Sequence, residues 1–318
     1  MKKLKDLKID EHFETYLLIK TAELRRTKAG KDYLAFTFQD ETGQIDGKLW
    51  DAQPIFVERF KAGVVVNIKG KKELYNGMPQ LNQITLQLAN NINLRPEDFK
   101  EKPPVNVEKL REEMTQTIFD IKNPTWNRIV RHLLKKYDEE FFSYPAAKTN
   151  HHAFETGLAF HSLTMIKIAR NLSAIYPELN ASLLYSGIIL HDLAKVIELS
   201  GVNNTEYTLR GNLIGHIVLI DEEISKAIIE LNIDENREDV LILRHVILSH
   251  HGLLEYGSPV RPKIMEAEII HQIDNLDATM QMLSGALRQV SPGETTSRVF
   301  ALDNRNFYKP TFKDDISD

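Results

Sequence analysis

Histidine and aspartate are concentrated in the second half of the chain, in positions where they could bind a metal ion. Ten of the 11 histidines follow residue 130. Two potential ligands, His191 and Asp192, are adjacent in the otherwise apolar stretch SGIILHDLAKV (186–196). Because burying an unpaired carboxylate costs much free energy, we expect Asp192 to have a strong partner. A bound cation would be such a partner.

The other candidate ligands are distant from this pair in the sequence. The complete set is His161, His191, Asp192, His216, His250, His251 and Asp274. The intervals from His161 to His191, Asp192 to His216, His216 to His250 and His250 to Asp274 are 30, 24, 34 and 24 residues. Such intervals exclude a local finger-type site and fit a helical bundle in which successive helices each contribute a ligand.

The donor types indicate which ions would bind. The chain contains no cysteine, which excludes disulfides and thiolate metal sites. Neutral imidazoles and carboxylates suit Mn, Fe, Co, Ni or Zn better than Ca or Mg. A carboxylate between two histidine clusters could bridge two ions, roughly 3.5–4 Å apart, which activate water and stabilise phosphate oxygens. Asp192 is the candidate for that bridging position.

Whether His251 and His271 bind a metal ion is open. Adjacent helical residues diverge by about 100°, so His250 and His251 would converge only at a distorted helix end, which Gly252 could produce. His271 is either a ligand or a supporting residue. Asp277 is expected to be a supporting hydrogen-bond acceptor.

Other polar residues in these helices have simpler alternatives. Lys195 either contacts a phosphate group or is a solvated lysine at the C-terminus of a helix. His132 and His245 are expected to be hydrogen-bonded core residues rather than ligands.

The first part of the chain has the pattern of β-strands. Five β-rich stretches are separated by Gly, Asp and Asn turns: 12–20, 32–40, 44–50, 63–74 and 78–88. Five short strands in under 95 residues indicate a small antiparallel barrel. In DYLAFTF, we expect Phe36 and Phe38 to be inside the barrel and Tyr33 outside.

The rest of the chain has the pattern of amphipathic helices. A segment rich in proline and charge, RPEDFKEKPPVN (95–106), precedes the first of them. Helical periodicity then recurs over 106–121, 127–137, 163–176, 181–197, 216–231, 239–250 and 262–283. From Val290 onward no helical period is evident. The sequence therefore predicts a β-barrel domain followed by an all-α domain.

Composition restricts the class of protein. Apolar residues make up 42% and charged residues 27% of 318 residues, which is ordinary for a globular protein. No segment has the roughly 18 consecutive apolar residues of a membrane span, and the start lacks the apolar core of a secretory signal. The absence of cysteine favours the cytoplasm.

Charge is unevenly distributed along the chain. The net charge is −5, but residues 1–95 contain 16 Lys and Arg against 12 Asp and Glu. This distribution fits either a nucleic-acid-binding surface in the first part of the chain or ordinary solvated surfaces.

The ordered ligand set resembles that of the HD superfamily of metal-dependent phosphohydrolases. His161, the pair His191–Asp192 and Asp274 correspond to its core motif. The additional His216 and His250, together with His251, resemble the members that hold two metals. In HDLAK, Lys195 is at the position where a lysine of the HD-x-x-K form contacts substrate phosphate.

The first part of the chain is similar to the OB-fold of tRNA-synthetase anticodon-binding domains, through KDYLAFTFQDETGQIDGKLWD. The resemblance implies a five-stranded barrel whose strands two and three bind nucleic acid with stacking aromatics and nearby lysines. The candidates in this sequence are Lys31, Tyr33, Lys48, Trp50, Lys71 and Tyr75.

An OB-fold followed by an HD domain is similar to the YhaM family of bacterial 3′→5′ exoribonucleases. The expected organisation is an OB-fold domain at 1–95, a linker and connecting helix at 96–130, and an HD phosphohydrolase domain with an irregular C-terminal extension at 131–318. The resemblance implies hydrolysis of single-stranded RNA, and also of single-stranded DNA, from the 3′ end to nucleoside monophosphates. It implies two divalent ions. Mn²⁺ is the first candidate, and Fe²⁺, Co²⁺ and Zn²⁺ are the alternatives.

In the expected mechanism Asp192 bridges the ions, and Lys195 or Arg210 contacts the phosphate. His152 would assist the leaving oxygen. Two alternatives stay open: an HD phosphodiesterase that acts on a small nucleotide under control of the barrel, and a nucleic-acid-binding factor without catalysis. No membrane partner is expected, and a homo-oligomer is compatible with the sequence.

Overall fold

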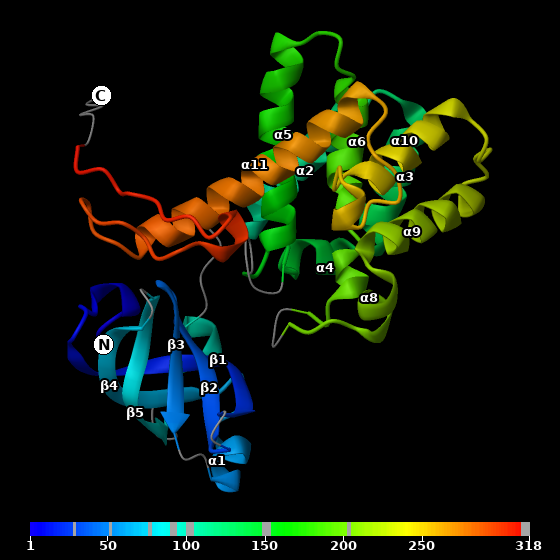
Figure 1. Ribbon diagram of the computed structural model, residues 1–318. Helices are drawn as coiled ribbons and strands as arrows, with labels where there is room; N and C mark the ends of the chain where they lie inside the picture. Colours follow the sequence, from blue (N-terminus) through cyan, green and yellow to red (C-terminus); the bar gives the residue numbers. More distant parts are fainter. Residues whose placement is uncertain are drawn as a thin grey trace. The chain divides into compact units, whose positions relative to one another are not determined.

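The computed structural model divides the chain into two compact units (Figure 1). One contains residues 1–102 and 282–318, and the other contains residues 103–281. The residues described are 1–27, 30–50, 53–75, 78–89, 94–99, 105–147, 154–201 and 205–312. Residues 131–318 were expected to form one domain, whereas residues 282–318 group with the first unit.

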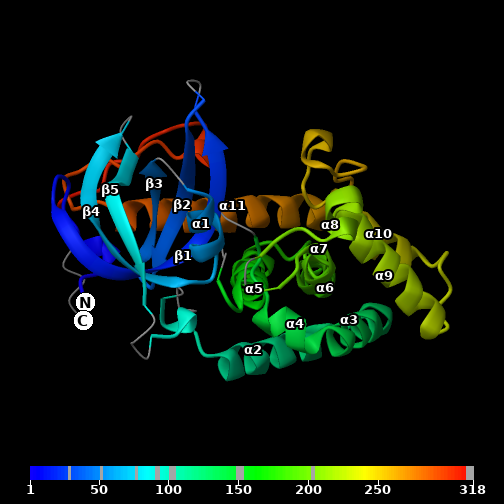
Figure 2. The ribbon, with the colours of Figure 1, turned by 90° about the horizontal axis from the view of Figure 1, so that it is seen from below.

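The first unit is built on a closed five-stranded barrel (Figure 2). Its strands are β1 (His12–Arg26), β2 (Asp32–Asp40), β3 (Gly43–Trp50), β4 (Val65–Tyr75) and β5 (Met78–Leu88). They close in the order β1-β2-β3-β5-β4, with β3 and β5 parallel and the other neighbours antiparallel. This arrangement confirms the expected barrel and is consistent with an OB-fold.

Alternation along β2 and β3 separates an apolar interior from a polar exterior. Phe36 and Phe38 are buried inside the barrel, as expected from the sequence. Tyr33 pairs with Trp50 across the two strands, on the opposite face of β2. Strand β1 continues six residues beyond the predicted end at Lys20, because after a register shift it pairs with β2 instead of β4.

Short helices and the C-terminal segment complete the first unit. The shorter elements are η1 (Leu4–Asp6), α1 (Pro54–Arg59), η2 (Pro96–Phe99) and η4 (Phe300–Leu302). The segment after residue 290 is irregular, as predicted, and contacts the barrel. A Cβ atom on Gly43 would lie 2.5 Å from the side chain of Gln289, which directly follows α11, so the chain that leads into this segment is closely packed against β3.

The second unit is a helical bundle. Its helices are α2 (Val107–Asp120), α3 (Pro124–Lys136), α4 (Asp138–Ser143), α5 (Gly157–Ile175), α6 (Ala181–His191), α7 (Lys195–Glu198), α8 (Leu209–Ile214), α9 (His216–Glu230), α10 (Glu238–Ser249), η3 (Leu254–Tyr256) and the first part of α11 (Met265–Arg288). Asparagine side chains cap the start of α2, α3 and α6, where they accept a main-chain N–H that lacks a helical partner.

Helix α6 is the central helix of the bundle and contacts α2, α3, α5, α9 and α10. Its residues from Leu183 to His191 are all buried, and so no polar face is visible in its sequence. At Gly187 a Cβ atom would lie 2.6 Å from side-chain atoms of both Val246 and Ile270. Only glycine therefore allows α10 and α11 to approach α6 this closely.

The sequence predicted one helix over 181–197, but α6 ends at His191. Asp192 is its C-cap residue, and a turn leads to the short α7. The helices α4 and α8 were not predicted, because each spans only six residues. No helix among the described residues is both long and apolar enough to cross a lipid bilayer.

Candidate metal centre

The five histidines among the candidate ligands share one arrangement: the Nδ1 atom of each contacts a protein oxygen. Three of these oxygens are main-chain carbonyls at 2.7 Å, in the pairs His191–Ile188, His250–Ile247 and His251–Tyr256. Because a carbonyl only accepts hydrogen bonds, Nδ1 must carry the proton in each ring. The Nε2 lone pair of each imidazole is then available to a cation.

The other two histidines contact carboxylates. His161 Nδ1 lies 2.6 Å from Asp277 Oδ2, and His216 Nδ1 lies 3.1 Å from Glu198 Oε1. A carboxylate behind a metal-binding imidazole fixes its orientation and increases its basicity. Asp277 therefore has the supporting position expected from the sequence.

Several buried nitrogen and oxygen atoms that could bind a metal ion have no hydrogen-bond partner among the described residues. They are Nε2 of His191, His216 and His250, and Oδ1 of Asp192. Such atoms cost free energy unless something outside the protein chain contacts them. Nitrogen and carboxylate oxygen are the donors that divalent transition metals prefer, so the residues fit a metal centre.

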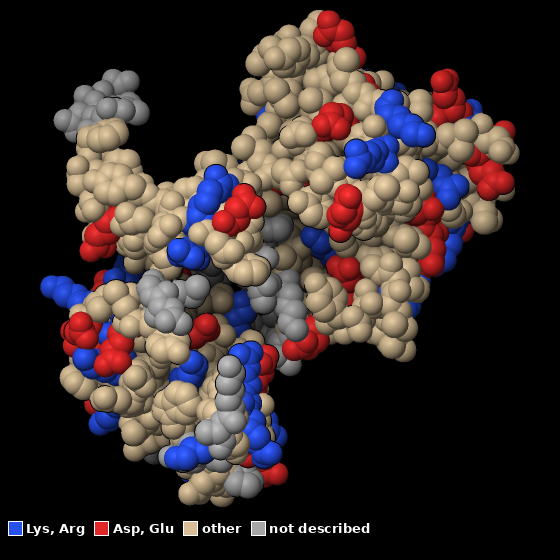
Figure 3. Space-filling model, viewed as in Figure 1, with Lys and Arg blue, Asp and Glu red and all other residues tan. Residues whose placement is uncertain are grey.

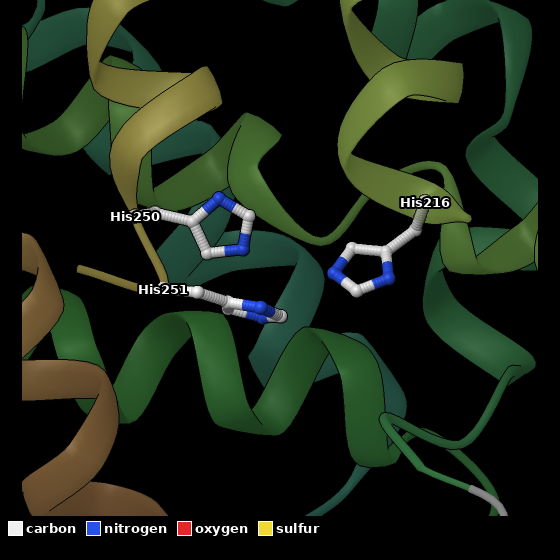
Figure 4. Close-up of side chains that lie close together, drawn as sticks. All are labelled: His216, His250 and His251. Atoms are coloured by element: carbon white, nitrogen blue, oxygen red, sulfur yellow. The ribbon is translucent and has the colours of Figure 1, made fainter. Parts of the chain in front are cut away.

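The potential ligand atoms form two groups, each within 4.8 Å. One contains His161, His191 and Asp274, and the other contains His216, His250 and His251. Figure 4 shows the three rings of the second group turned toward one another.

Asp192 lies between the two groups. Its Oδ2 atom is 3.3 Å from His191 Nε2 and 3.8 Å from His161 Nε2. Its Oδ1 atom is 3.4 Å from His216 Nε2. This is the arrangement that a bridging carboxylate requires.

The ends of helices bring these side chains together. His191 is the last residue of α6, His216 is the first residue of α9, and His250 directly follows α10. His161 lies inside α5 and Asp274 inside α11. Ligands at helix ends can approach one centre from different directions.

Gly252 allows His250 and His251 to converge. Its φ of +74° turns the chain out of the helix, and the two rings are 4.4 Å apart between centroids. A Cβ atom on Gly252 would lie 2.4 Å from the ring of His271. The distorted helix end considered in the sequence analysis is therefore present.

Charge in the centre favours a cation. Burial would raise the pKa of the Asp192 carboxyl, but His191 and Lys195 outweigh it and hold the pKa well below its usual range. Burial would lower the pKa of His161, but Asp274 and Asp277 raise it to about 9, so a metal ion that binds this ring must displace its Nε2 proton. Burial lowers the pKa of His250 well below its usual value, so that ring is neutral, as metal binding requires.

A comparison with protein-family models adds to this geometry. Residues 158–279 match the model of the HD domain. The helical bundle contains an HD domain. HD domains bind divalent metal ions, and the match together with the two donor groups supports a metal-dependent phosphohydrolase.

A cavity of about 430 Å³ in the HD domain adjoins the candidate metal centre. His216, His251 and Asp274 are among its lining residues, together with Lys195. The Lys195 ammonium donates to Asp192 Oδ2 at 2.7 Å. Burial would lower the pKa of Lys195, but Asp192 outweighs it and raises the pKa, so the lysine is charged beside the cavity.

Two predicted catalytic residues do not join this arrangement in the described part of the structure. Arg210 donates to Glu222 at 2.8 Å and does not line the cavity, so the structure gives no support for its contact with phosphate. His152 lies outside the described residues.

The remaining histidines have other neighbours. His271 Nδ1 lies 3.1 Å from the carbonyl oxygen of His250, so His271 supports the segment that carries a ligand. His132 Nε2 pairs with Glu230 at 3.0 Å, and His245 Nε2 accepts from the Lys263 amide at 2.9 Å. Both are half-buried rather than core residues.

Sequence analysis missed Glu198. Its carboxylate accepts from both the amide and Nδ1 of His216, each at 3.1 Å, and so fixes this histidine at the start of α9. The residue is buried and lies in the apolar stretch AKVIEL. Like Asp192, Glu198 is a carboxylate in an apolar stretch and therefore needs a partner, which was the signal for it in the sequence.

A second group of predicted residues meets on the barrel. Tyr33 and Trp50 have ring centroids 5.0 Å apart. Lys48 Nζ lies 5.9 Å from the Trp50 ring and 4.9 Å from the Tyr75 ring. Trp50 and Tyr75 are 49% and 57% exposed. Large exposed rings beside a lysine suit stacking with a base.

Two predicted lysines lie apart from this barrel cluster of Tyr33, Lys48, Trp50 and Tyr75. Lys71 pairs with Asp10 at 2.8 Å and Glu73 at 3.0 Å. Lys31 is exposed beside the start of β2, in the turn that follows β1. Figure 3 shows basic and acidic side chains interspersed on the visible face rather than gathered into one basic area.

Proposed function

We propose that the protein is a metal-dependent 3′→5′ exoribonuclease, which hydrolyses single-stranded RNA, and also single-stranded DNA, to nucleoside monophosphates. The observation that carries the hydrolytic part is the set of buried imidazole and carboxylate atoms without hydrogen-bond partners around Asp192. The nucleic-acid part rests on the barrel cluster and on the resemblance to the YhaM family.

The two donor groups would hold two divalent ions, with Mn²⁺ as the first candidate. His161, His191 and Asp274 would bind one ion, His216, His250 and His251 the other, and Asp192 both. Two such ions activate water and neutralise charge on the phosphate during in-line displacement.

The residues of the chain have separate tasks in this proposal. Asp277 and Glu198 orient His161 and His216 through Nδ1. Lys195 is charged and lines the cavity, so it attracts the phosphodiester. The cavity is within the usual range of about 300–1,000 Å³ for small-ligand sites, which suits one terminal nucleotide better than a duplex.

The barrel would hold the RNA strand largely without sequence preference. Stacking on Tyr33, Trp50 and Tyr75 is available to every base, because every base has a π face. Lys48 lies beside these rings and would contact the phosphate backbone. Binding by stacking also agrees with the net charge of −5, which provides no overall attraction for RNA.

The first test is Asp192→Asn. We expect it to abolish hydrolysis of single-stranded RNA in Mn²⁺, because the carboxylate shared by the two donor groups is lost. RNA affinity should be nearly unchanged, because the barrel cluster lies in the other unit. The measurements are product analysis on 5′-labelled RNA and equilibrium binding of the same RNA by fluorescence anisotropy.

Asp120→Asn is the matched control, since Asp120 forms a surface ion pair with Arg170. RNA with a blocked 3′ end separates the alternatives. Cleavage of free but not blocked RNA supports the exonuclease. If neither RNA is cleaved and a small nucleotide diester is, the protein is a small-nucleotide phosphodiesterase. If RNA binds and the purified protein contains no metal, it is a binding factor.

A further inference from the structure

Two exposed aromatic side chains border the cavity of the HD domain. Tyr207 is 52% exposed and Tyr256 is 62% exposed, and both line the cavity. They come from segments 49 positions apart, which precede α8 and end η3. Large exposed rings that line one polar cavity together with a charged lysine suit stacking with a base.

The main chain around Tyr207 is fixed to the segment that supports His216. Tyr207 forms an isolated β-bridge with Leu199, and the Thr208 amide donates to the Glu198 carbonyl at 2.9 Å. The Glu198 side chain in turn holds His216. The position of Tyr207 is therefore set relative to the metal centre.

Tyr256 is connected to the centre in the same way. Its carbonyl accepts from Nδ1 of the candidate ligand His251 at 2.7 Å. Its amide donates to the Leu253 carbonyl at 3.1 Å, which closes the short helix η3. The main chain of Tyr256 thus orients the histidine, while its ring is left at the cavity.

We propose that Tyr207 and Tyr256 form a subsite for the nucleobase of the 3′-terminal nucleotide, beside the centre that cleaves its phosphodiester. This inference rests on the proposed function and names the group that the site holds. Stacking binds purines and pyrimidines alike, so the subsite would accept any terminal base while fixing the scissile phosphate near Lys195.

The chemistry of the cavity favours a nucleotide over other phosphate esters. Lys195 and divalent ions held by the candidate ligands would take the phosphate. Tyr207 and Tyr256 present exposed phenol rings at the same cavity. A phosphate ester without a base would leave them exposed to water.

The test compares two ligands that differ only in the base, AMP and ribose 5-phosphate. Equilibrium binding of each is measured by isothermal titration calorimetry in the presence of Mn²⁺. We expect the native protein to prefer AMP. Tyr256→Ala should reduce this preference by about fivefold to a hundredfold, the effect of losing one ring that stacks on a base. Tyr256→Phe should keep most of it.

Tyr176→Ala is the matched control, because Tyr176 is 54% exposed, follows α5 and does not line the cavity. Equal affinity of the native protein for both ligands would refute the subsite. So would a Tyr256→Ala variant that weakens both ligands by the same factor, since that result means a disturbed His251. Failure of the native protein to cleave RNA would instead refute the proposed function, and the AMP preference is measured independently of cleavage.

Discussion

At the scale of single residues, the Nδ1 contacts define the centre. Each of the five imidazoles contacts a protein oxygen through Nδ1, so the rings turn Nε2 toward the positions around Asp192. The carboxylates behind two of the rings are therefore as important as the ligands themselves.

Asp277→Asn tests this dependence. The amide removes the negative charge that orients His161 and supports its basicity, and we expect affinity for Mn²⁺ to fall by about tenfold to a hundredfold. The measurement is calorimetric titration of the metal-free protein with Mn²⁺. Asp120→Asn should bind the metal as the native protein does. Equal affinities in all three proteins would mean that Asp277 has no role in the centre.

At the scale of elements, the centre depends on where helices begin and end. Helix α9 presents His216 at its first residue and is attached to α3 by a buried carboxylate. Glu223 of α9 accepts from Nζ of Lys136, the last residue of α3, at 2.6 Å and from Oη of Tyr137, which follows it, at 2.7 Å. It also accepts from Lys226 Nζ at 2.6 Å. This cluster therefore stabilises the helix that carries a ligand.

Glu223→Gln should lower the free energy of unfolding by about 1–3 kcal/mol at pH 7, because charged hydrogen bonds are lost. Burial would raise the pKa of Glu223, but Lys136, Lys226 and Tyr137 lower it to about 2. The folded-state pKa is thus below the usual 4.5, so this stability is complete above about pH 4.5 and disappears as the pH falls toward 2.

The measurement is urea unfolding of both proteins at several pH values, in which the difference between them should narrow below pH 4.5. Glu222→Gln is the neighbouring control. Glu222 forms an exposed ion pair with Arg210, so its replacement should change the free energy of unfolding by at most about 1 kcal/mol. A difference that stays constant with pH would exclude Glu223 as the titrating group.

At the scale of the whole molecule, the two units carry different parts of the proposed function. The chain from residue 282 onward groups with the barrel, and Gln289 lies against Gly43. Deleting residues 1–95 would therefore remove the packing partner of this segment as well as the RNA-binding surface. Point substitutions on the barrel are the cleaner test.

Trp50→Ala should weaken binding of single-stranded RNA by about fivefold to a hundredfold, the loss expected for one stacked base. Hydrolysis of a dinucleotide should be nearly unchanged, because Trp50 belongs to the other unit. Fluorescence anisotropy and dinucleotide kinetics measure the two effects. Phe300→Ala is the control, since Phe300 is 82% exposed, lies in η4 of the same unit and is not a member of the barrel cluster. An equal loss in both assays would contradict the separation of roles.

The sequence alone determined the two architectures and most of the candidate centre. Alternation of polar and apolar residues predicted the barrel strands, and helical periodicity predicted the long helices, because both patterns reflect local burial. The order and types of the candidate ligands, which resemble those of the HD superfamily, also indicated His161, His191, Asp192, His216 and Asp274.

Only the tertiary structure decided what depends on contacts between distant segments. The end of α6 at Asp192, the convergence of His250 and His251, and the support of His216 by Glu198 all arise where separate helices meet. It also brought Tyr207 and Tyr256 to one cavity and grouped the C-terminal segment with the barrel. Local patterns record which face of an element is buried, but not which distant residue it packs against.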